Sequence, residues 1–177
     1  MWQKVGRNGG KGSTICFYLS VDSHAMDTNT YISAPIYAGE FRHAVDPKGR
    51  VTVPSKWRRA DSEDFYVLPD QKNTYLIIMP PEEFKAMGRK IEANTAISEA
   101  DKRVFLRTFF SQAQPVTVDR QGRMILPEAY SQRVGITEEV VLAGGDVRFE
   151  IWSPERWEST IQEKQDVYCN VADSIGL

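Results

Sequence analysis

A five-residue pattern, Asp-x-x-Gly-Arg, occurs twice in this chain of 177 residues, at residues 46–50 and again at residues 119–123. Each copy continues with three strand-forming residues and a proline, at residues 51–54 and 124–127. Equivalent positions keep a constant offset, since 119 − 46 and 127 − 54 both equal 73. A fixed period of this length is too long for a solenoid and predicts one small module used twice.

The same offset continues downstream, where it places Val67 on Val140 and Phe84 on Trp157. A module of roughly 50 to 60 residues buries too little surface to be stable alone. We therefore expect the two halves to share one core, and an apolar fraction of 41% is sufficient for it.

Period-2 alternation predicts two hairpins in each module, with a short helix between them and a closing helix after them. Ser55 is expected to cap the first short helix, and Ser98 with Asp101 resembles a capping box for a connecting helix. The predicted division is an N-terminal extension (residues 1–35, expected to be disordered), a first module (36–94), a connecting helix (95–113), a second module with its closing helix (114–164) and a C-terminal tail (165–177).

The N-terminal extension has a weak likeness to a secretory signal, because a basic, glycine-rich start precedes a short apolar patch at residues 13–21. The patch contains Thr14 and Tyr18 and runs directly into Asp22, which favours two other readings. These are a disordered extension, or translation that begins upstream of a natural start at Met26.

Composition removes several classes of protein. No apolar run approaches the roughly 20 residues that span a bilayer. The two cysteines, Cys16 and Cys169, have no metal-ligand spacing, which predicts no metal site and favours a reducing compartment. The net charge of −2 argues against a nucleic-acid partner, but residues 36–60 hold six Lys or Arg against two acidic residues. A local basic face can still steer binding to phosphate.

The chemistry of the repeated pattern follows from its residue types. Glycine permits a tight turn with positive φ, and aspartate can accept bonds from backbone N–H groups within that turn. The arginine then leaves on a strand, where its planar fork can engage guanine O6 and N7 or a phosphate. An internal ion pair between Asp46 and Arg50 is the alternative, and duplication does not separate the two readings.

These residues resemble the MraZ family of bacterial transcriptional regulators, whose hallmark is one such motif in each of two AbrB-type modules. The resemblance covers residues 36–163 and rests on four stretches, residues 46–59, 105–110, 119–123 and 148–152. It implies an α+β fold of two tandem swapped-hairpin β-barrel modules related by a pseudo-twofold axis, with flanking helices. It also implies a cytoplasmic, nucleoid-associated protein that assembles into homo-oligomeric rings. Such rings bind short G-rich direct repeats in double-stranded DNA upstream of the operon for division and cell-wall synthesis.

Carried over to this chain, the resemblance assigns DNA contacts to two arginines and structural roles to the turn residues around them. The expected DNA contacts are Arg50, Arg123, Lys48, Arg42 and Arg120, and the turn-forming residues are Asp46, Gly49, Asp119 and Gly122. Because Gln121 stands where the first copy has Lys48, we expect the second turn to contribute less to affinity.

Antitoxins and enzymes are the two alternative classes of function. AbrB-like folds also occur in antitoxins, but residues after Lys164 show no clear partner-binding amphipathic helix. An enzyme would need catalytic groups, and His43 near Asp46 is more typical of a surface or packing residue. No nucleophile elbow or phosphate loop is present, so we predict no enzyme activity, no cofactor, no small-molecule substrate and no membrane association.

Overall fold

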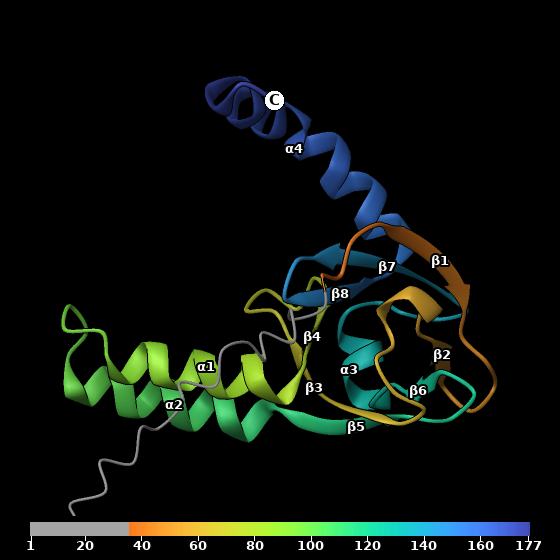
Figure 1. The fold of residues 1–177 in the computed structure, drawn as a ribbon, viewed down its shortest axis with the longest axis horizontal. Helices are drawn as coiled ribbons and strands as arrows, with labels where there is room; N and C mark the ends of the chain where they lie inside the picture. The colour runs from red at the N-terminus through yellow and green to blue at the C-terminus, as the bar shows by residue number, and fades with distance from the viewer. Residues whose placement is uncertain (1–35) are drawn as a thin grey trace, which may run out of the picture. The chain divides into compact units, whose positions relative to one another are not determined.

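The computed structural model describes residues 36–177 (Figure 1). The predicted N-terminal extension, residues 1–35, lies outside the described residues. The elements in chain order are β1 (Glu40–Ala44), β2 (Arg50–Thr52), the 3-10 turn η1 (Ser55–Trp57), β3 (Glu63–Pro69), β4 (Leu76–Met79), α1 (Pro81–Glu92), α2 (Glu99–Gln112), β5 (Gln114–Val118), β6 (Arg123–Ile125), α3 (Glu128–Arg133), β7 (Glu139–Gly145), β8 (Arg148–Trp152) and α4 (Pro154–Ile175).

Six strands form one antiparallel sheet in the order β1-β7-β8-β4-β3-β5. The repeat relates β1 to β5, β7 to β3 and β8 to β4, so the order reads the same from either edge. Each edge strand pairs with a strand of the other module, as in the pairing of β1 with β7. The two modules therefore interlock around a pseudo-twofold axis that passes between β4 and β8.

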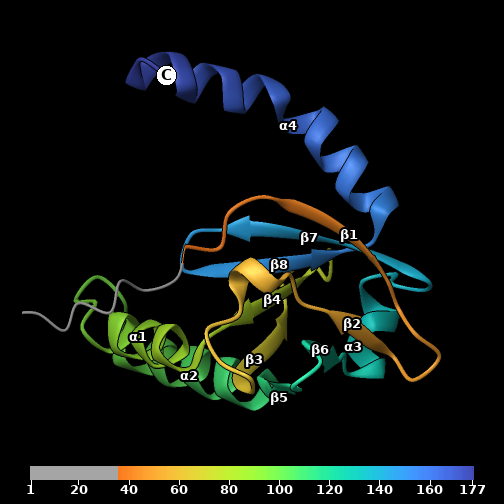
Figure 2. The same ribbon diagram turned by 45° about the vertical axis from the view of Figure 1, so that its right-hand side comes forward.

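The α+β class is confirmed, but the predicted closed barrel is wrong. The sheet is open, with β1 and β5 as its edges. The reason lies in β2 and β6, which are three residues each and pair with one another as a separate two-stranded ribbon. They are therefore not inserted between the two edges (Figure 2).

The constant offset of 73 also fails between the two hairpins. Tyr66 pairs with Met79 in the first module, and Val141 pairs with Trp152 in the second. Met79 and Trp152 are 73 apart, whereas Tyr66 and Val141 are 75 apart. The second module therefore has two extra residues before its hairpin. They follow Pro127, where the six-residue helix α3 stands in place of the three-residue η1 that follows Pro54. The β7–β8 turn is correspondingly shorter than the β3–β4 turn.

The core lies between the sheet and the ribbon. Trp57 is 1% exposed, and its indole N–H donates to the carbonyl of Ala38 at 3.0 Å. The Trp57 ring packs against Phe149, with 5.0 Å between ring centroids. Val51 of β2 and Met124 of β6 are both fully buried on the inner side of the ribbon. Because successive strand residues point to opposite faces, their neighbours along the ribbon face outward.

The helices follow the predicted local signals in most places. Ser98 accepts the Asp101 backbone N–H at 3.1 Å, which confirms the capping residue of α2. Ser55 makes no capping hydrogen bond, since Pro54 occupies the cap position of η1. Helices α1 and α2 lie side by side as a hairpin (Figure 1). Phe84 of α1 packs on the sheet, stacked on Tyr66 with centroids 4.1 Å apart.

Helix α4 leaves the sheet after β8 and none of its residues is buried (Figures 1 and 2). Residues 165–175, expected to form a tail, continue this helix. No helix among residues 36–177 is long and apolar enough to cross a membrane.

Candidate nucleic-acid interface

The two Asp-x-x-Gly-Arg turns have the same backbone geometry. In the first, Oδ1 of Asp46 accepts the backbone N–H groups of Lys48 and Arg50, each at 2.9 Å. In the second, Oδ1 of Asp119 accepts those of Gln121 at 2.9 Å and Arg123 at 3.0 Å. Each aspartate therefore fixes its turn through two main-chain bonds.

The glycines have the conformation that the sequence required. Gly49 has φ of +72° and Gly122 has φ of +78°. In this left-handed region a residue with a β-carbon is strained. The two turns are therefore built on the same combination of a side-chain acceptor and a left-handed glycine.

Both arginines form ion pairs with the aspartate of their own turn. Nε of Arg50 donates to Oδ2 of Asp46 at 2.6 Å, and Nη2 of Arg123 donates to Oδ2 of Asp119 at 2.9 Å. The internal ion pair, which is the alternative to DNA contact in the sequence analysis, is thus present in both copies. Each ion pair also fixes the orientation of its guanidinium, which does not prevent that guanidinium from binding an external partner.

The aspartates are held in their ionised form. Backbone N–H donation from Arg50 is the main cause that lowers the pKa of Asp46. Hydrogen bonding from the Arg123 guanidinium is the main cause that lowers the pKa of Asp119. Charged carboxylates accept stronger hydrogen bonds, which keeps both turns rigid near neutral pH.

The β2–β6 ribbon places both arginines on one face. Arg50 pairs with Ile125, and Thr52 pairs with Arg123, while Val51 and Met124 fill the buried face between them. Arg50 and Arg123 are therefore diagonal neighbours on the outward face, with backbones roughly 7–8 Å apart. The two turns thus present two arginines from one face of the ribbon, each oriented by its own aspartate.

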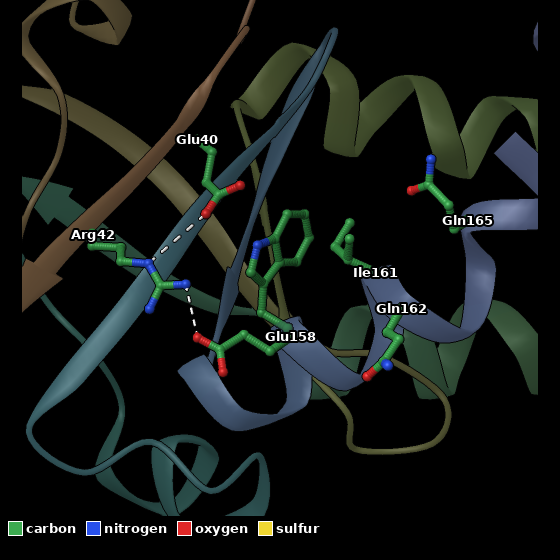
Figure 3. Close-up of a pocket in the computed structure, with 7 residues that line it drawn as sticks. Glu40, Arg42, Glu158, Ile161, Gln162 and Gln165 are labelled. Atoms are coloured by element: carbon green, nitrogen blue, oxygen red, sulfur yellow. Dashed lines mark hydrogen bonds and ion pairs between the residues drawn. The ribbon is translucent and has the colours of Figure 1, made fainter. Parts of the chain in front are cut away.

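Among the other predicted contacts, Lys48 and Arg120 are exposed at the tips of the two turns. Arg42 lies elsewhere. Its Nη2 donates to Glu158 of α4 at 3.0 Å, and its Nε lies 3.9 Å from Glu40, on one wall of a groove of about 590 Å³ between β1 and α4 (Figure 3). Arg42 is engaged by two carboxylates and belongs to the contact with α4.

One residue near the turns was missed by sequence reasoning. The guanidinium of Arg58 lies directly against Gly122 in the second turn, although the two residues are 64 positions apart. The only signal in the sequence was its membership in the basic stretch of residues 36–60. The local charge near the ribbon is 5 − 2 = +3. Five cations, Arg50, Arg58, Arg123, Lys48 and Arg120, stand against the two turn aspartates, Asp46 and Asp119.

This arrangement offers charge and hydrogen-bond donors and lacks the parts of a metal centre. The described residues contain no group of His, Cys, Asp and Glu placed to hold a metal ion. His43 lies on β1, opposite Val140 of β7. The absence of enzyme activity stays a prediction.

Fold and site together define a class: a tandem-repeat α+β protein whose interlocked halves present paired arginine turns on one ribbon. The family model for the MraZ protein, described as antitoxin-like, matches residues 36–108 and again residues 109–172. The chain belongs to the MraZ family.

Several relatives are similar over most of the chain. The protein named transcriptional regulator MraZ of Heliobacterium modesticaldum is 36% identical over 140 residues, which cover 79% of this chain and 96% of that protein. The protein of the same name from Symbiobacterium thermophilum is 36% identical over 139 residues, covering 78% and 99%. That of Clostridium tetani is 36% identical over 123 residues, covering 70% and 85%.

Proposed function

We propose that this protein is a DNA-binding transcriptional regulator that reads its site through Arg50 and Arg123. The observation that carries the proposal is the shared outward face of the β2–β6 ribbon, on which Arg50 and Arg123 are diagonal neighbours and each is paired with the aspartate of its own turn. The names of the relatives, which call them transcriptional regulators, support the same class of function.

The free donors of the two arginines suggest how the ribbon engages DNA. Arg50 donates to Asp46 only through Nε, so its terminal nitrogens Nη1 and Nη2 make no hydrogen bond to another described residue. Those two nitrogens are the pair that binds guanine O6 and N7 in a bidentate manner. Arg123 gives both Nε and Nη2 to Asp119, which leaves fewer donors for a base. We assign Arg50 to base recognition and Arg123 to a base or a neighbouring phosphate.

A two-stranded ribbon fits the width of the major groove. The exposed turn tips would then lie beside the backbone, where Lys48 and Arg120 can neutralise phosphates. Two presented arginines suit a G-rich target. From the family resemblance we propose that this target is a set of short direct repeats upstream of the division and cell-wall operon, and that the protein acts at the nucleoid.

We also propose that the two modules are swapped-hairpin modules of the AbrB type and that copies of the protein assemble into a ring. Helix α4 supplies a suitable contact, because it carries an apolar stripe that the described residues leave uncovered. Ile161, Tyr168 and Ile175 recur every seven residues and are 47%, 63% and 70% exposed. An uncovered stripe of this length on a helix is typical of a surface that binds a partner.

The test is fluorescence anisotropy with a duplex from immediately upstream of the gene for this protein and a shuffled duplex of equal composition. Wild type, Arg50→Ala and Arg123→Ala would be compared at two salt concentrations, with Lys85→Ala on the exposed side of α1 as the control for loss of one positive charge. We expect tight, salt-sensitive binding to the native duplex that Arg50→Ala abolishes and Lys85→Ala leaves intact. Equal weak binding to both duplexes, indifferent to Arg50, would refute the proposal.

A second candidate is an antitoxin-like protein-interaction module. The exposed stripe of α4 favours it, since the same stripe could bind a different protein. The two candidates differ in the anisotropy assay, because an interaction module without DNA recognition does not distinguish the native duplex from the shuffled one.

A further inference from the structure

The two turns are not covered alike. A β-carbon built on Gly122 would lie 2.5 Å from both Cζ and Nη1 of Arg58, so the guanidinium of Arg58 packs on the α-carbon of Gly122. A β-carbon built on Gly49 would meet only the carbonyl oxygen of Leu126, at 3.8 Å. Gly122 is accordingly buried, whereas Gly49 is partly exposed. A cation from the first module therefore covers the second turn.

The path of the chain explains how Arg58 reaches this place. Strand β2 runs antiparallel to β6, so its end lies at the second turn, where the Val53 N–H donates to the carbonyl of Gly122 at 2.8 Å. The short η1 then stops at Trp57, and Arg58 adopts an extended conformation with φ of −88° and ψ of 130°. In the second module α3 continues to Arg133, so Ser131, at the equivalent position, stays helical. Within residues 36–177, no such cation packs on Gly49 of the first turn.

Arg58, like Arg120, has no carboxylate partner among the described residues. Within residues 36–177, Arg42, Arg50, Arg59 and Arg123 all form ion pairs, and Arg58 forms none. Its Nε is buried without a hydrogen-bond partner among the same residues. An unsatisfied buried donor on a charged group is costly and calls for a specific reason. Nη1 and Nη2 of Arg58 also have no hydrogen-bond partner within residues 36–177 and are not buried, so these two nitrogens can receive an anion from outside the chain.

We propose that Arg58 binds a DNA phosphate beside the second turn. In this role it takes the place of Lys48, which lies in the first turn and has no lysine equivalent in the second. This inference rests on the proposed function. It revises the expectation that the second turn contributes less to affinity, which was based on Gln121 alone. The second turn has Arg58 from the other module, so both turns have a backbone contact next to the arginine that faces the groove.

The experiment measures the dissociation constant of the native duplex over a series of salt concentrations for wild type, Arg58→Gln and Arg58→Lys. Lys85→Gln on α1 is the matched control, since it removes one positive charge at a distance from the ribbon. A phosphate contact contributes about 0.9 to the slope of log K against log salt, which corresponds to about eightfold in affinity at 0.1 M salt. Arg58→Gln should lose this amount on both the native and the shuffled duplex, and Arg58→Lys should retain the wild-type slope.

Thermal melting of each variant separates this role from a structural one. If Arg58→Gln binds with the wild-type slope, or loses affinity only as far as it loses folded protein, Arg58 is a packing residue and the inference is wrong. An Arg58→Lys slope reduced as far as that of Arg58→Gln would also contradict a contact made by charge. If wild type fails to bind either duplex, the proposed function itself falls. If wild type and Arg58→Gln bind equally, the proposed function stands and only the role of Arg58 is refuted.

Discussion

The two turn glycines provide a matched pair of substitutions within one molecule. Gly49→Ala places a β-carbon in the left-handed region, which costs roughly 1–2 kcal/mol, but that carbon meets nothing closer than 3.8 Å. Gly122→Ala has the same backbone strain and in addition drives a carbon to within 2.5 Å of the Arg58 guanidinium. Arg58 has a flexible side chain and can move aside, so the extra cost is the loss of its packing, about 1 kcal/mol.

Urea unfolding of the two variants measures the difference directly. When Arg58 is present, we expect the Gly122→Ala variant to be less stable than the Gly49→Ala variant by about 1 kcal/mol. In an Arg58→Ala background the difference should disappear, because the obstructing group has gone and only the shared strain remains. Equal stabilities in wild type would show that Arg58 does not pack on Gly122. A difference that persists without Arg58 would assign it to another cause.

The other predictions concern acid, assembly and the core. The pKa values of Asp46 and Asp119 are lowered by folding, so their stabilisation is present above the unfolded pKa of roughly 3.9 and is lost as pH falls through the folded pKa. Urea midpoints should therefore fall more steeply on acidification below about pH 4 in wild type than in the Asp46→Asn, Asp119→Asn double variant. A chain that ends at Lys164 lacks Tyr168 and Ile175 and should lose self-association by light scattering, and an unchanged mass would exclude residues 165–175 of α4 as the contact. Trp57→Ala should cost about 3–5 kcal/mol in urea unfolding, because the ring is fully buried among aromatic neighbours, and a loss below about 1 kcal/mol would contradict that packing.

Features decided by short-range chemistry could be predicted from the sequence. The Asp-x-x-Gly-Arg turns form as expected, because the acceptor, the left-handed glycine and the arginine lie within five residues. The Ser98 cap follows from residues three apart. Helices α1 and α4 begin at their prolines for a similar local reason.

Features decided by partners distant in the chain could not be predicted. The pairing of β1 with β7 depends on how the two modules interlock, and alternation alone does not specify a partner strand. The constant offset failed where α3 replaced a single short turn, since the proline is followed by helix-forming residues in one copy only. Arg58 was missed because it lies 64 residues from the turn that it covers. The ion pair of Arg42 with Glu158 on α4 could not be predicted because the two residues are 116 positions apart, and the DNA contact of Arg42 stays a prediction.

The interlocking of the modules has a consequence for synthesis on the ribosome. Glu40 of β1 pairs with Ala143 of β7, 103 residues later in the chain. At about 5–20 residues per second, roughly 5–20 s pass between the emergence of the two partners. During that time the first half has an incomplete sheet, and its ribbon strand β2 has no β6 to pair with. The β2–β6 ribbon therefore cannot form in a nascent first module, and it waits for the synthesis of β6, which begins 71 residues after the end of β2.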